Sequence, residues 1–492
     1  MRSIHYIIIG AILASCAEAL ADNYRYRLHL DGKPGSEPVK LSERAQERRA
    51  RYGIVADSLD LEISPGYIEQ IEAAGLVVVT RSHWLNTVVV MGKDGASVPA
   101  SLFESLPFVS KVETITTTQR ATSPVRLTAQ SHVAADGENC TSPLKQVNAY
   151  EPLYMAGHRG AGMLVAILDA GFTRVDQWEW LNSRVVGTRD LYQPTTGTSH
   201  IYDGDMHGSC CLSIMASPEE HGICGTAQEA DYCLMRTETD DSETQLEEDM
   251  WVAAAELADS LGVDVISSSL GYYDFDVEES SHTYDDFGQD RVCISRGAKV
   301  ACQKGILVVN AAGNERNNYW NSLIFPADVE EVLAVGAVTP SNRLASFSSP
   351  GFTVPYVKPD VVGRGTRCYV IDYRGGVDTY GSGTSYATPL IAGLCTSLWS
   401  AVPELSAAQI RQVVRESASQ YSQPDSLMGY GLPDFGLALT KARQWVEEMG
   451  IEEVKAETPL RSTGIFNLQG QRCANRPRQG IFIENGRLKF LR

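Results

Sequence analysis

The chain is predicted to be an α/β protein built on a doubly wound parallel sheet, with a small α+β region before it and a short β-rich segment after it. Short continuous apolar runs, typical of strands buried on both faces, alternate with helical patterns over residues 146–445. This alternation predicts a parallel sheet covered on both faces, with right-handed crossovers. The predicted strands are Met163–Leu168, Val263–Ser267, Ile306–Asn310 and Val332–Val338, and the predicted helices before the second and third strands are Trp251–Ser260 and Ile294–Lys304.

The first residues have the pattern of an export signal. Arg2 precedes an apolar run, Ile7–Ala14, and the small residues of Ala19–Ala21 stand at cleavage-site spacing. We therefore interpret residues 1–21 as a secretory signal peptide, since the run is too short for a spanning helix. In a second interpretation, Leu13–Cys16 resembles a bacterial lipobox, which would leave a lipidated Cys16 at the mature N-terminus. Both interpretations send the protein out of the cytoplasm.

Residues 22–120 form the small α+β region. Its β patterns are Tyr24–Leu30, Leu76–Thr80 and Asn86–Met91, and its helical patterns are Leu41–Tyr52, Gly66–Ala74 and Ala100–Ser105. Because this region directly follows a signal peptide, we interpret it as a prodomain; the alternative is an N-terminal domain that the mature protein keeps. Residues 121–145 carry Thr, Ser, Pro, Gly and Asn without periodicity, which is typical of a linker and makes them a candidate cleavage region.

Composition argues against a membrane-spanning protein and against a nucleic-acid-binding protein. No stretch after the N-terminus is long and apolar enough to span a membrane. The balance of 42 basic against 61 acidic residues, a net charge of −19, argues against nucleic acid, whose binding relies on Lys and Arg contacts to phosphates. Export permits disulfides, but the sequence does not determine their pairing, and no paired C-x-x-C spacing predicts zinc. Five cysteines lie inside helix patterns, where buried free thiols are expected: Cys210, Cys211, Cys293, Cys302 and Cys395.

A serine between a glycine-rich turn and an apolar helix pattern is the strongest chemical signal in the chain. This residue, Ser385, lies in the segment Gly381–Pro389. A serine hydroxyl is a poor nucleophile unless a base takes its proton and donors stabilise the oxyanion. A helix N-terminus provides free N–H groups and a favourable dipole for that charge. The alternative is an ordinary serine cap of a helix.

Three further residues are candidates, two of them at the carboxyl ends of strands, where open α/β sheets place functional groups. Asp169 follows the first predicted strand, Asn314 follows the strand Ile306–Asn310, and His207 begins a helical pattern. Taken singly, each suits a cap, a surface position or a turn. Together with Ser385 they are the ingredients of acyl transfer by a serine nucleophile.

These residues also carry a family resemblance. Their order matches the subtilisin-like serine peptidases, whose triad runs Asp, His, Ser. Val165–Gly171 resembles the aspartate motif of that family, His207–Ser209 its histidine motif and Gly383–Pro389 its serine motif. The resemblance covers residues 146–445 and implies two substrate-binding edges beside a triad and an oxyanion asparagine. The implied residues are Asp169, His207 and Ser385 for the triad, Asn314 for the oxyanion hole, and Ser269, Leu270, Gly271, Ala311, Ala312 and Gly313 for the edges.

The resemblance implies a secreted serine endopeptidase whose 22–120 region is an inhibitory, fold-assisting propeptide. Its partners would then be protein or peptide substrates and its own propeptide; no cofactor or catalytic metal is required, and a structural calcium ion is compatible with the family. The alternative function is a catalytically weak pseudo-peptidase that binds peptides or partners in the cell envelope. An α/β-hydrolase esterase or lipase does not fit, because Ala387 replaces the second glycine of Gly-x-Ser-x-Gly and the histidine precedes the serine.

Several positions need separate interpretation. Ala170 stands where the family usually has Ser or Thr, which removes a hydroxyl beside the aspartate, and Arg364 stands where the family has a proline, which is expected to loosen a turn near the site. Asp203 and Asp205, just before the histidine, are expected to be solvated or to hold a cation; the alternative is that they favour a basic or amino group of the substrate nearby. The acidic run Glu238–Asp249 is expected to be a solvated surface.

Residues 446–492 form a distinct C-terminal segment. The Glu-rich stretch Val446–Thr458 precedes two hairpin-like patterns, Gly464–Gln471 and Gly480–Gly486. The segment resembles the C-terminal end of many secreted proteins of the Bacteroidetes group, some of which carry sorting signals there. It therefore implies secretion, or a place in the cell envelope of a Gram-negative bacterium. The alternative is a small β module packed on the preceding domain.

Overall fold

The computed structural model describes residues 24–116, 140–181, 183–193, 197–239, 242–288, 290–371 and 377–450, and four short strands between residues 465 and 491. The predicted signal peptide, Cys16, residues 121–139 of the predicted linker and most of the Glu-rich stretch lie outside the described residues. Residues up to Ala442 belong to one compact unit, and residues from Arg443 onward belong to a second.

A seven-stranded parallel sheet confirms the predicted α/β fold. The strand order is β11-β10-β9-β8-β5-β7-β6, and each neighbouring pair is parallel. The strands are β5 (Leu164–Asp169), β6 (Val185–Asp190), β7 (Asp231–Arg236), β8 (Val265–Ser268), β9 (Leu307–Ala311), β10 (Leu333–Val338) and β11 (Val361–Arg364). The four predicted strands correspond to β5, β8, β9 and β10. The other three were not predicted, because their apolar runs are short and bounded by charged residues or glycine.

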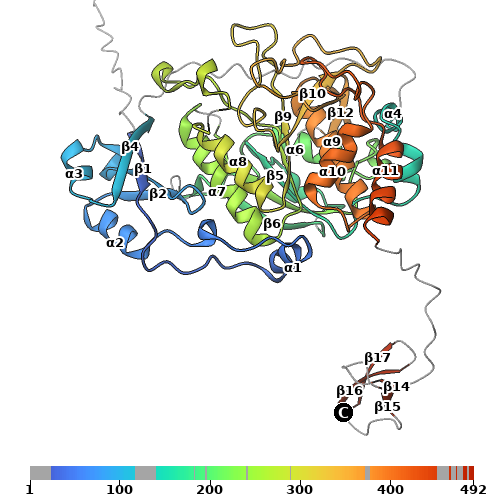
Figure 1. The fold of residues 1–492 in the computed structure, drawn as a ribbon, viewed down its shortest axis with the longest axis horizontal. Helices are drawn as coiled ribbons and strands as arrows, with labels where there is room; N and C mark the ends of the chain where they lie inside the picture. Colours follow the sequence, from blue (N-terminus) through green and yellow to red (C-terminus); the bar gives the residue numbers. More distant parts are fainter. Residues whose placement is uncertain are drawn as a thin grey trace, which may run out of the picture. The chain divides into compact units, whose positions relative to one another are not determined.

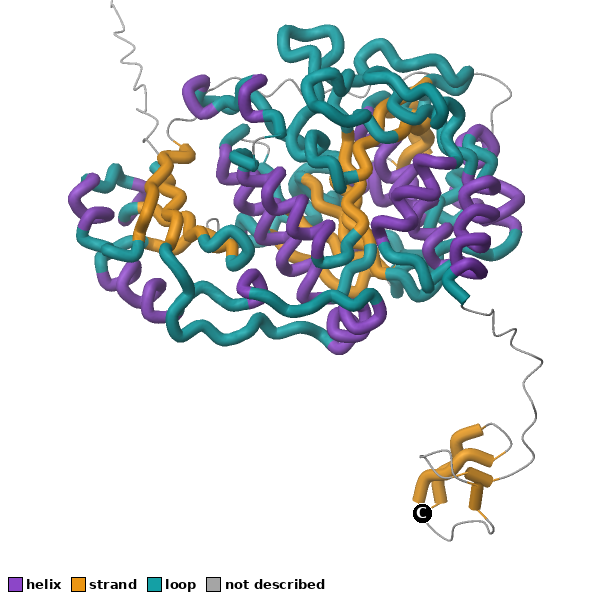
Figure 2. Tube along the Cα trace, viewed as in Figure 1, coloured by secondary structure: helices purple, strands orange, loops and turns teal. Residues whose placement is uncertain are grey.

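Helices cover both faces of this sheet (Figures 1 and 2). One face carries α7 (Gln245–Leu261) and α8 (Cys293–Gln303), and the other carries α6 (His207–Ala216), α9 (Thr384–Ala401) and α10 (Ala407–Glu416), with α11 (Phe435–Glu448) following them in the chain. The core under α7 and α8 includes Trp251, Ala255, Ile294 and Ala298. Helix α7 begins six residues before the predicted start at Trp251, since Thr244 and Glu247 form a capping box there.

The cysteines of these helices follow the sequence prediction with one exception. Cys210, Cys211, Cys293 and Cys395 are buried free thiols, whereas Cys302 is half-buried. Cys302 lies next to the last residue of α8, where the helix leaves the core.

The N-terminal region is an antiparallel α+β unit, as predicted. Its sheet has the order β2-β3-β1-β4. The elements are β1 (Arg25–Leu30), β2 (Val77–Ser82), β3 (Thr87–Met91), β4 (Val109–Thr116), α1 (Glu43–Arg51), α2 (Pro65–Ala73) and α3 (Ala100–Glu104). Strand β4 was not predicted, because Lys111 and Glu113 interrupt its apolar residues. Strands β2 and β4 pack against α7, so this sheet lies on the outer side of a helix that covers the larger sheet (Figure 1).

The acidic run Glu238–Asp249 is not the solvated surface that we expected. Glu247, Glu248 and Asp249 are each at most 3% exposed. Glu247 accepts the backbone N–H groups of Thr239 and Thr244, and Glu248 Oε1 lies 2.9 Å from His282 Nε2. The guanidinium of Arg27, in β1, binds Asp249 through Nε–Oδ1 (2.9 Å) and Nη2–Oδ2 (2.6 Å). The carboxylates are buried because each has a partner, and for Asp249 the partner comes from the N-terminal region.

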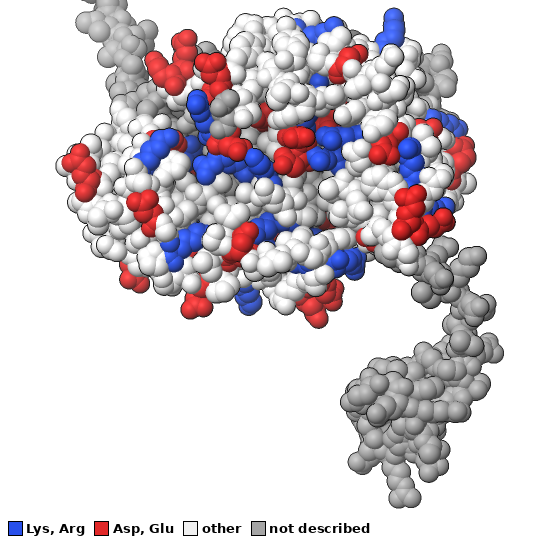
Figure 3. All heavy atoms as spheres, viewed as in Figure 1, with Lys and Arg blue, Asp and Glu red and all other residues white. Residues whose placement is uncertain are grey.

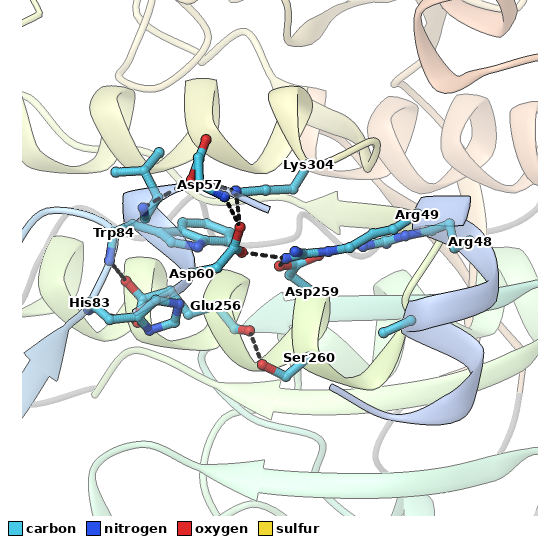
Figure 4. A network of polar contacts seen from close by, with 12 residues as sticks. Arg48, Arg49, Asp57, Asp60, His83, Trp84, Glu256, Asp259, Ser260 and Lys304 are labelled. Atoms are coloured by element: carbon cyan, nitrogen blue, oxygen red, sulfur yellow. Dashed lines mark hydrogen bonds and ion pairs between the residues drawn. The ribbon is translucent and has the colours of Figure 1, made fainter. Parts of the chain in front are cut away.

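A second group of ion pairs joins the N-terminal region to the ends of α7 and α8 (Figure 4). Asp259 of α7 accepts hydrogen bonds from Arg48 and Arg49 of α1. Lys304, which caps α8 and is 2% exposed, lies 2.8 Å from Asp60 Oδ2. Removing one partner of such a pair leaves an uncompensated buried charge, which costs about 3–5 kcal/mol. The two regions are therefore held in register by matched charges as well as by apolar packing.

The C-terminal unit contains a small antiparallel sheet. Its strands are β14 (Ile465–Phe466), β15 (Arg472–Cys473), β16 (Gly480–Glu484) and β17 (Arg487–Leu491), in the order β15-β14-β16-β17. Strands β16 and β17 pair in register from Gly480 with Leu491 to Glu484 with Arg487. The β-rich character that the glycine-bounded patterns predicted is therefore present in this segment.

Charged side chains of both signs are exposed among the described residues of the chain. Within those residues, every helix is either too short or too polar to cross a bilayer. On the face drawn in Figure 3, acidic and basic side chains are interspersed.

Candidate active site

Asp169 and His207 meet at the carboxyl edge of the central sheet. Asp169 is the last residue of β5 and has no exposed surface, and His207 is the first residue of α6. His207 Nδ1 lies 2.8 Å from Asp169 Oδ1. The His207 side chain keeps 30% of its surface exposed, so the ring has a buried end and an open end. This arrangement holds the ring with Nε2 free to take part in proton transfer.

The electrostatic environment makes His207 a stronger base than an ordinary histidine. Burial lowers the pKa of His207, but the nearby Asp169 carboxylate outweighs burial and raises that pKa well above 6.5. The cause is local, since charge–charge attraction between the imidazolium and a buried carboxylate is screened little by solvent. A proton accepted by His207 would therefore be held firmly.

Two neighbours allow helix α6 to begin at this point. Asp205, two residues before the helix, accepts the backbone N–H of His207, so this half-buried carboxylate has a structural contact. A Cβ at Gly208 would lie 2.8 Å from Asp169 Cβ and 2.4 Å from Gly171 O, so only glycine permits this approach of α6 to β5. Asp203 is exposed, and its Oδ1 lies 3.1 Å from Nδ1 of a different histidine, His200.

Ser385 lies in the first turn of α9, beyond the hairpin of β12 (Cys368–Ile371) and β13 (Val377–Gly381). Its backbone N–H is one of the donors that a helix N-terminus leaves free. Its hydroxyl donates a long 3.4 Å hydrogen bond to the Ser269 carbonyl, and no hydrogen bond joins it to His207 within the described chain. The ring of Tyr386, the next residue, is 5.9 Å from the His207 ring, centroid to centroid. Hydrogen bonds of serine nucleophiles often tighten only when substrate binds.

Asn314 is held beside the start of α9. Its Oδ1 accepts the backbone N–H of Thr384 at 2.9 Å and the Thr384 hydroxyl at 3.2 Å. Because the carbonyl end of the amide is occupied in this way, the Nδ2 end is turned away from Thr384 and can donate. Gly313, with φ of +107°, provides the left-handed backbone that carries the chain from β9 to this position. The amide donor and the N–H groups of α9 can thus serve one developing negative charge.

Comparison with known protein families identifies the family of this chain. Residues 160–431 match a family model described as the Subtilase family. The chain belongs to the subtilase family. Residues 32–130 match a second model, the peptidase S8 propeptide domain of Bacteroidota. The protein is therefore a subtilisin-like serine protease with a propeptide region.

Individual subtilases are distant in sequence. Subtilisin DY of Bacillus licheniformis is 30% identical over 54% of this chain and 86% of its own length. Subtilisin E of Bacillus subtilis strain 168 is 29% identical over 62% of this chain and 72% of its own. The minor extracellular protease Epr of the same strain is 26% identical over 67% of this chain, which spans about half, 47%, of that relative.

The two predicted substrate edges of this subtilase differ in what they expose. Leu270, Ala311 and Ala312 are at most 6% exposed, so their side chains belong to the core and only their backbone can meet a substrate. Ser269 is turned inward as well, and its hydroxyl donates to Ser385 O at 2.8 Å. Gly271 and Gly313 have no side chains. The edges can therefore contribute backbone hydrogen bonds to an extended peptide. Such binding depends little on the side chains of the peptide.

The residue after Asp169 is an alanine, and one oxygen of the Asp169 carboxylate lacks a hydrogen-bond donor among the described residues. The backbone N–H of Ala170 donates to Asp169 Oδ1 at 2.9 Å. Asp169 Oδ2 is buried and has no partner among the described residues. A serine or threonine at position 170 would carry a hydroxyl next to this carboxylate, so the unpaired oxygen matches the departure from the family pattern.

Arg364 does not loosen the chain as we expected. It is the last residue of β11 and only 2% exposed. Its guanidinium donates to the carbonyls of Thr366 (3.4 Å) and Arg367 (3.1 Å), so it bridges the turn that follows. The expectation was wrong because the side chain replaces the rigidity of a proline ring with hydrogen bonds to the backbone.

Two positioning residues were not recognised from the sequence. Thr384 orients the Asn314 amide, as described above, and Cys211 lies under the site. Cys211 is fully buried, with Sγ 3.9 Å from His207 Nδ1 and 3.5 Å from both Ser269 Oγ and Ser385 O. Burial raises the pKa of its thiol, which keeps it protonated and unreactive. The four-residue spacing from His207 to Cys211 on one helix was the available signal.

Two groups of described residues have a spacing that suits a metal ion. One consists of Asp169, His207 and Cys211, whose ligand atoms serve the site just described. The other consists of Cys140, Glu219 and Cys224. The hydrogen bond between Asp169 and His207 accounts for the first group. The group of Cys140, Glu219 and Cys224 has no function in the active site.

Proposed function

We propose that this subtilase is a secreted endopeptidase in which Ser385, His207 and Asp169 act as nucleophile, base and orienting carboxylate. The observation that carries the proposal is the 2.8 Å hydrogen bond from His207 to Asp169 at the sheet edge where α9 also begins. A strongly basic, partly exposed imidazole beside a serine is the arrangement that peptide hydrolysis needs.

In the proposed mechanism, His207 Nε2 takes the Ser385 hydroxyl proton as the oxygen attacks the peptide carbonyl. The tetrahedral oxyanion then accepts hydrogen bonds from Asn314 Nδ2 and the Ser385 backbone N–H. His207 next donates its proton to the leaving amine, and water repeats the sequence on the acyl-enzyme. Asp169 keeps the ring in the required tautomer and stabilises its charged form. No cofactor is needed for these steps.

The N-terminal region supports a second part of the proposal, that residues 22–120 are the inhibitory propeptide. Its β2–β3 turn docks on Glu256 of α7, which lies 2.6 Å from His83 Nδ1 and accepts the Trp84 backbone N–H at 2.9 Å (Figure 4). Such contacts give the buried Glu256 carboxylate hydrogen-bond partners from the N-terminal region. Cleavage in the predicted linker, residues 121–145, would convert this covalent attachment into a dissociable complex.

Export is the third part of the proposal. Residues 1–21 have a signal-peptide pattern, the propeptide match is of Bacteroidota type, and one relative is named an extracellular protease. A Gram-negative bacterium would release the protein or keep it in its envelope. Intact-mass measurement and N-terminal sequencing of the exported protein distinguish cleavage after Ala21 from lipidation at Cys16.

Ser385→Ala tests the assignment, with Ser400→Ala as the matched control. Both serines lie on α9, and the Ser400 hydroxyl donates to Ser397 O of the same helix. We expect Ser385→Ala to lose peptide hydrolysis, to lose labelling by a serine-directed phosphonate and, if maturation is autocatalytic, to retain residues 22–120. Ser400→Ala should behave as wild type. Absence of labelling and hydrolysis in a folded, processed wild-type protein would instead favour the peptide-binding pseudo-peptidase.

A further inference from the structure

Two cysteines lie together away from the active site, where the catalytic region begins. Cys140 lies inside the predicted linker, residues 121–145, and is the first residue that the structure describes after residue 116, whereas Cys224 lies in the loop that follows α6. They are 84 positions apart in the chain, and their Sγ atoms lie 2.6 Å apart. Nonbonded heavy atoms ordinarily stay about 3.5–4.0 Å apart. The two thiols are therefore closer than two separate groups can remain.

The surroundings of this pair are ordered on both sides. On the Cys224 side, the loop is bonded back to α6 through Gly225 N to Ser217 O (2.8 Å) and Thr226 N to Ile214 O (3.1 Å). On the Cys140 side, the helix α4 (Ser142–Gln146) follows directly. A small cavity of about 30 Å³ beside the pair has apolar walls that include Ile214, Ile223 and Leu390. The sulfur atoms are thus held in a fixed, mostly apolar environment.

We propose that Cys140 and Cys224 form a disulfide in the exported protein. The neighbouring Glu219 makes a metal site the competing explanation, since the three ligand atoms lie within 4.8 Å of one another. Two thiolates on a tetrahedral zinc ion, each about 2.3 Å from the metal, would lie roughly 3.8 Å apart. A separation of 2.6 Å is too short for that geometry and is close to a covalent pair. The inference rests on the proposed export, because disulfides persist in oxidising compartments; it does not rest on catalysis.

The bond forms by thiol–disulfide exchange. One cysteine thiolate attacks a disulfide oxidant, either a small-molecule disulfide or a thiol–disulfide oxidoreductase, and releases one thiol of it. The second cysteine then attacks the mixed disulfide and releases the other thiol. Overall, Cys140 and Cys224 lose two protons and two electrons, and the oxidant gains them.

The position of the bond gives it a function in the mature enzyme. If the linker is cut before Cys140, the segment that carries this cysteine becomes the new N-terminal end and is no longer continuous with the propeptide. The disulfide anchors this end to the loop behind α6, the helix that starts with His207. It also closes a long loop in the unfolded chain, which lowers the entropy gained on unfolding.

Peptide mapping of the purified protein in a glutathione redox buffer tests the bond without depending on export or activity. The chain is denatured without reductant, alkylated with iodoacetamide and digested, in parallel with the Ser385→Ala protein. We expect one linked peptide pair containing Cys140 and Cys224 in both proteins, lighter by two hydrogen masses than the reduced pair. Alkylation of both cysteines in the unreduced sample overturns the proposal, as does a stoichiometric zinc content that the Cys140→Ser/Cys224→Ser variant loses.

Thermal unfolding provides the second measurement. The oxidised mature enzyme should unfold roughly 5–10 °C above both its dithiothreitol-treated form and the Cys140→Ser/Cys224→Ser variant. Dithiothreitol should not change the melting temperature of that variant. Cys302→Ser, which removes a half-buried thiol on the opposite side of the sheet, is the control and should keep the full sensitivity to reductant. Equal melting temperatures with and without reductant in the wild-type enzyme overturn the anchoring role.

Discussion

Asp169 holds His207 through one carboxylate oxygen, Oδ1, while its buried Oδ2 has no partner among the described residues. The same Oδ1 also accepts the backbone N–H of Ala170. With few donors to stabilise it, the carboxylate interacts strongly with the ring beside it, and the low polarity of the buried site strengthens that attraction. The basicity of His207 therefore depends chiefly on Asp169.

The pH dependence of hydrolysis should report this basicity. Burial lowers the pKa of His207, but the Asp169 carboxylate outweighs burial and raises it well above 6.5. Because the proposed base works only when neutral, kcat/KM should rise with pH, and the midpoint of its acid limb should lie above 6.5. Initial rates with a short peptide substrate across the neutral and alkaline range measure this midpoint. A midpoint below 6.5 contradicts the proposed role of the pair.

Ala170→Ser should shift that acid limb toward lower pH, by about half a unit. A hydroxyl donated to Asp169 Oδ2 stabilises the carboxylate and weakens its pull on the imidazolium, so the pKa of His207 falls. The pH profile of kcat/KM measures the shift, and the melting temperature shows whether the buried hydroxyl is accommodated. An unchanged profile in a stable variant would mean that Oδ2 has another donor.

Asp169→Asn should lower kcat by about 10⁴-fold, the loss seen when a triad aspartate becomes an amide. The amide can donate to His207 Nδ1, which favours the wrong tautomer and no longer stabilises the imidazolium. Asp203→Asn is the control, because that exposed carboxylate lies near the site without contacting His207. Comparable losses in both variants would assign the effect to general electrostatics.

Asn314→Ala should lower kcat by about 10²–10³-fold with little change in KM, as expected for a donor that acts on the oxyanion. The change also frees the Thr384 backbone N–H, so the melting temperature is measured alongside. Asn317→Ala, three residues later and exposed, removes an amide whose one hydrogen bond among the described residues goes to Ser346 O, and it should keep full activity. A rise in KM at constant kcat would place Asn314 in ground-state binding instead.

Asp60→Asn should destabilise the unprocessed Ser385→Ala protein by roughly 2–4 kcal/mol at neutral pH. Burial opposes ionisation of Asp60, but hydrogen bonds from Arg49 and Lys304 outweigh it and lower the pKa to about 2. This folded-state pKa lies below the unfolded value of about 3.9, so the carboxylate stabilises the fold fully above about pH 4 and ceases to do so as pH falls through about 2.

The melting temperatures of the two unprocessed proteins, measured against pH, test this reasoning. The difference between them should be constant near neutrality and should narrow between about pH 4 and pH 2. Asp31→Asn, an exposed carboxylate in the same region, is the control and should show no such difference. A difference that persists below pH 2 would mean that the variant acts through packing.

The sequence predicted the strands that the core buries on both faces. Strands β5, β8, β9 and β10 are continuous apolar runs, so their hydrophobicity alone identified them. Edge strand β6 and the amphipathic strand β4 carry charged residues at exposed positions, and their pairing depends on neighbours far away in the chain. The acidic start of α7 was misjudged for the same reason, because the partner of Asp249 is Arg27, 222 positions earlier.

The residue types of the candidate site were determined by the sequence, since Asp169, His207, Asn314 and Ser385 each follow a strand or begin a helix with their own local signature. Their contacts were decided only by the tertiary structure. Parallel strand ends converge at one edge, and Gly208 allows α6 to approach β5 closely enough for the imidazole to meet the carboxylate. The roles of Thr384, Cys211 and Arg364, and the meeting of Cys140 with Cys224, likewise depend on packing between distant segments. Neighbouring residues in the chain determine which chemical groups a segment carries. Which of those groups are buried, and which partners they contact, depends on the segments that the fold brings together.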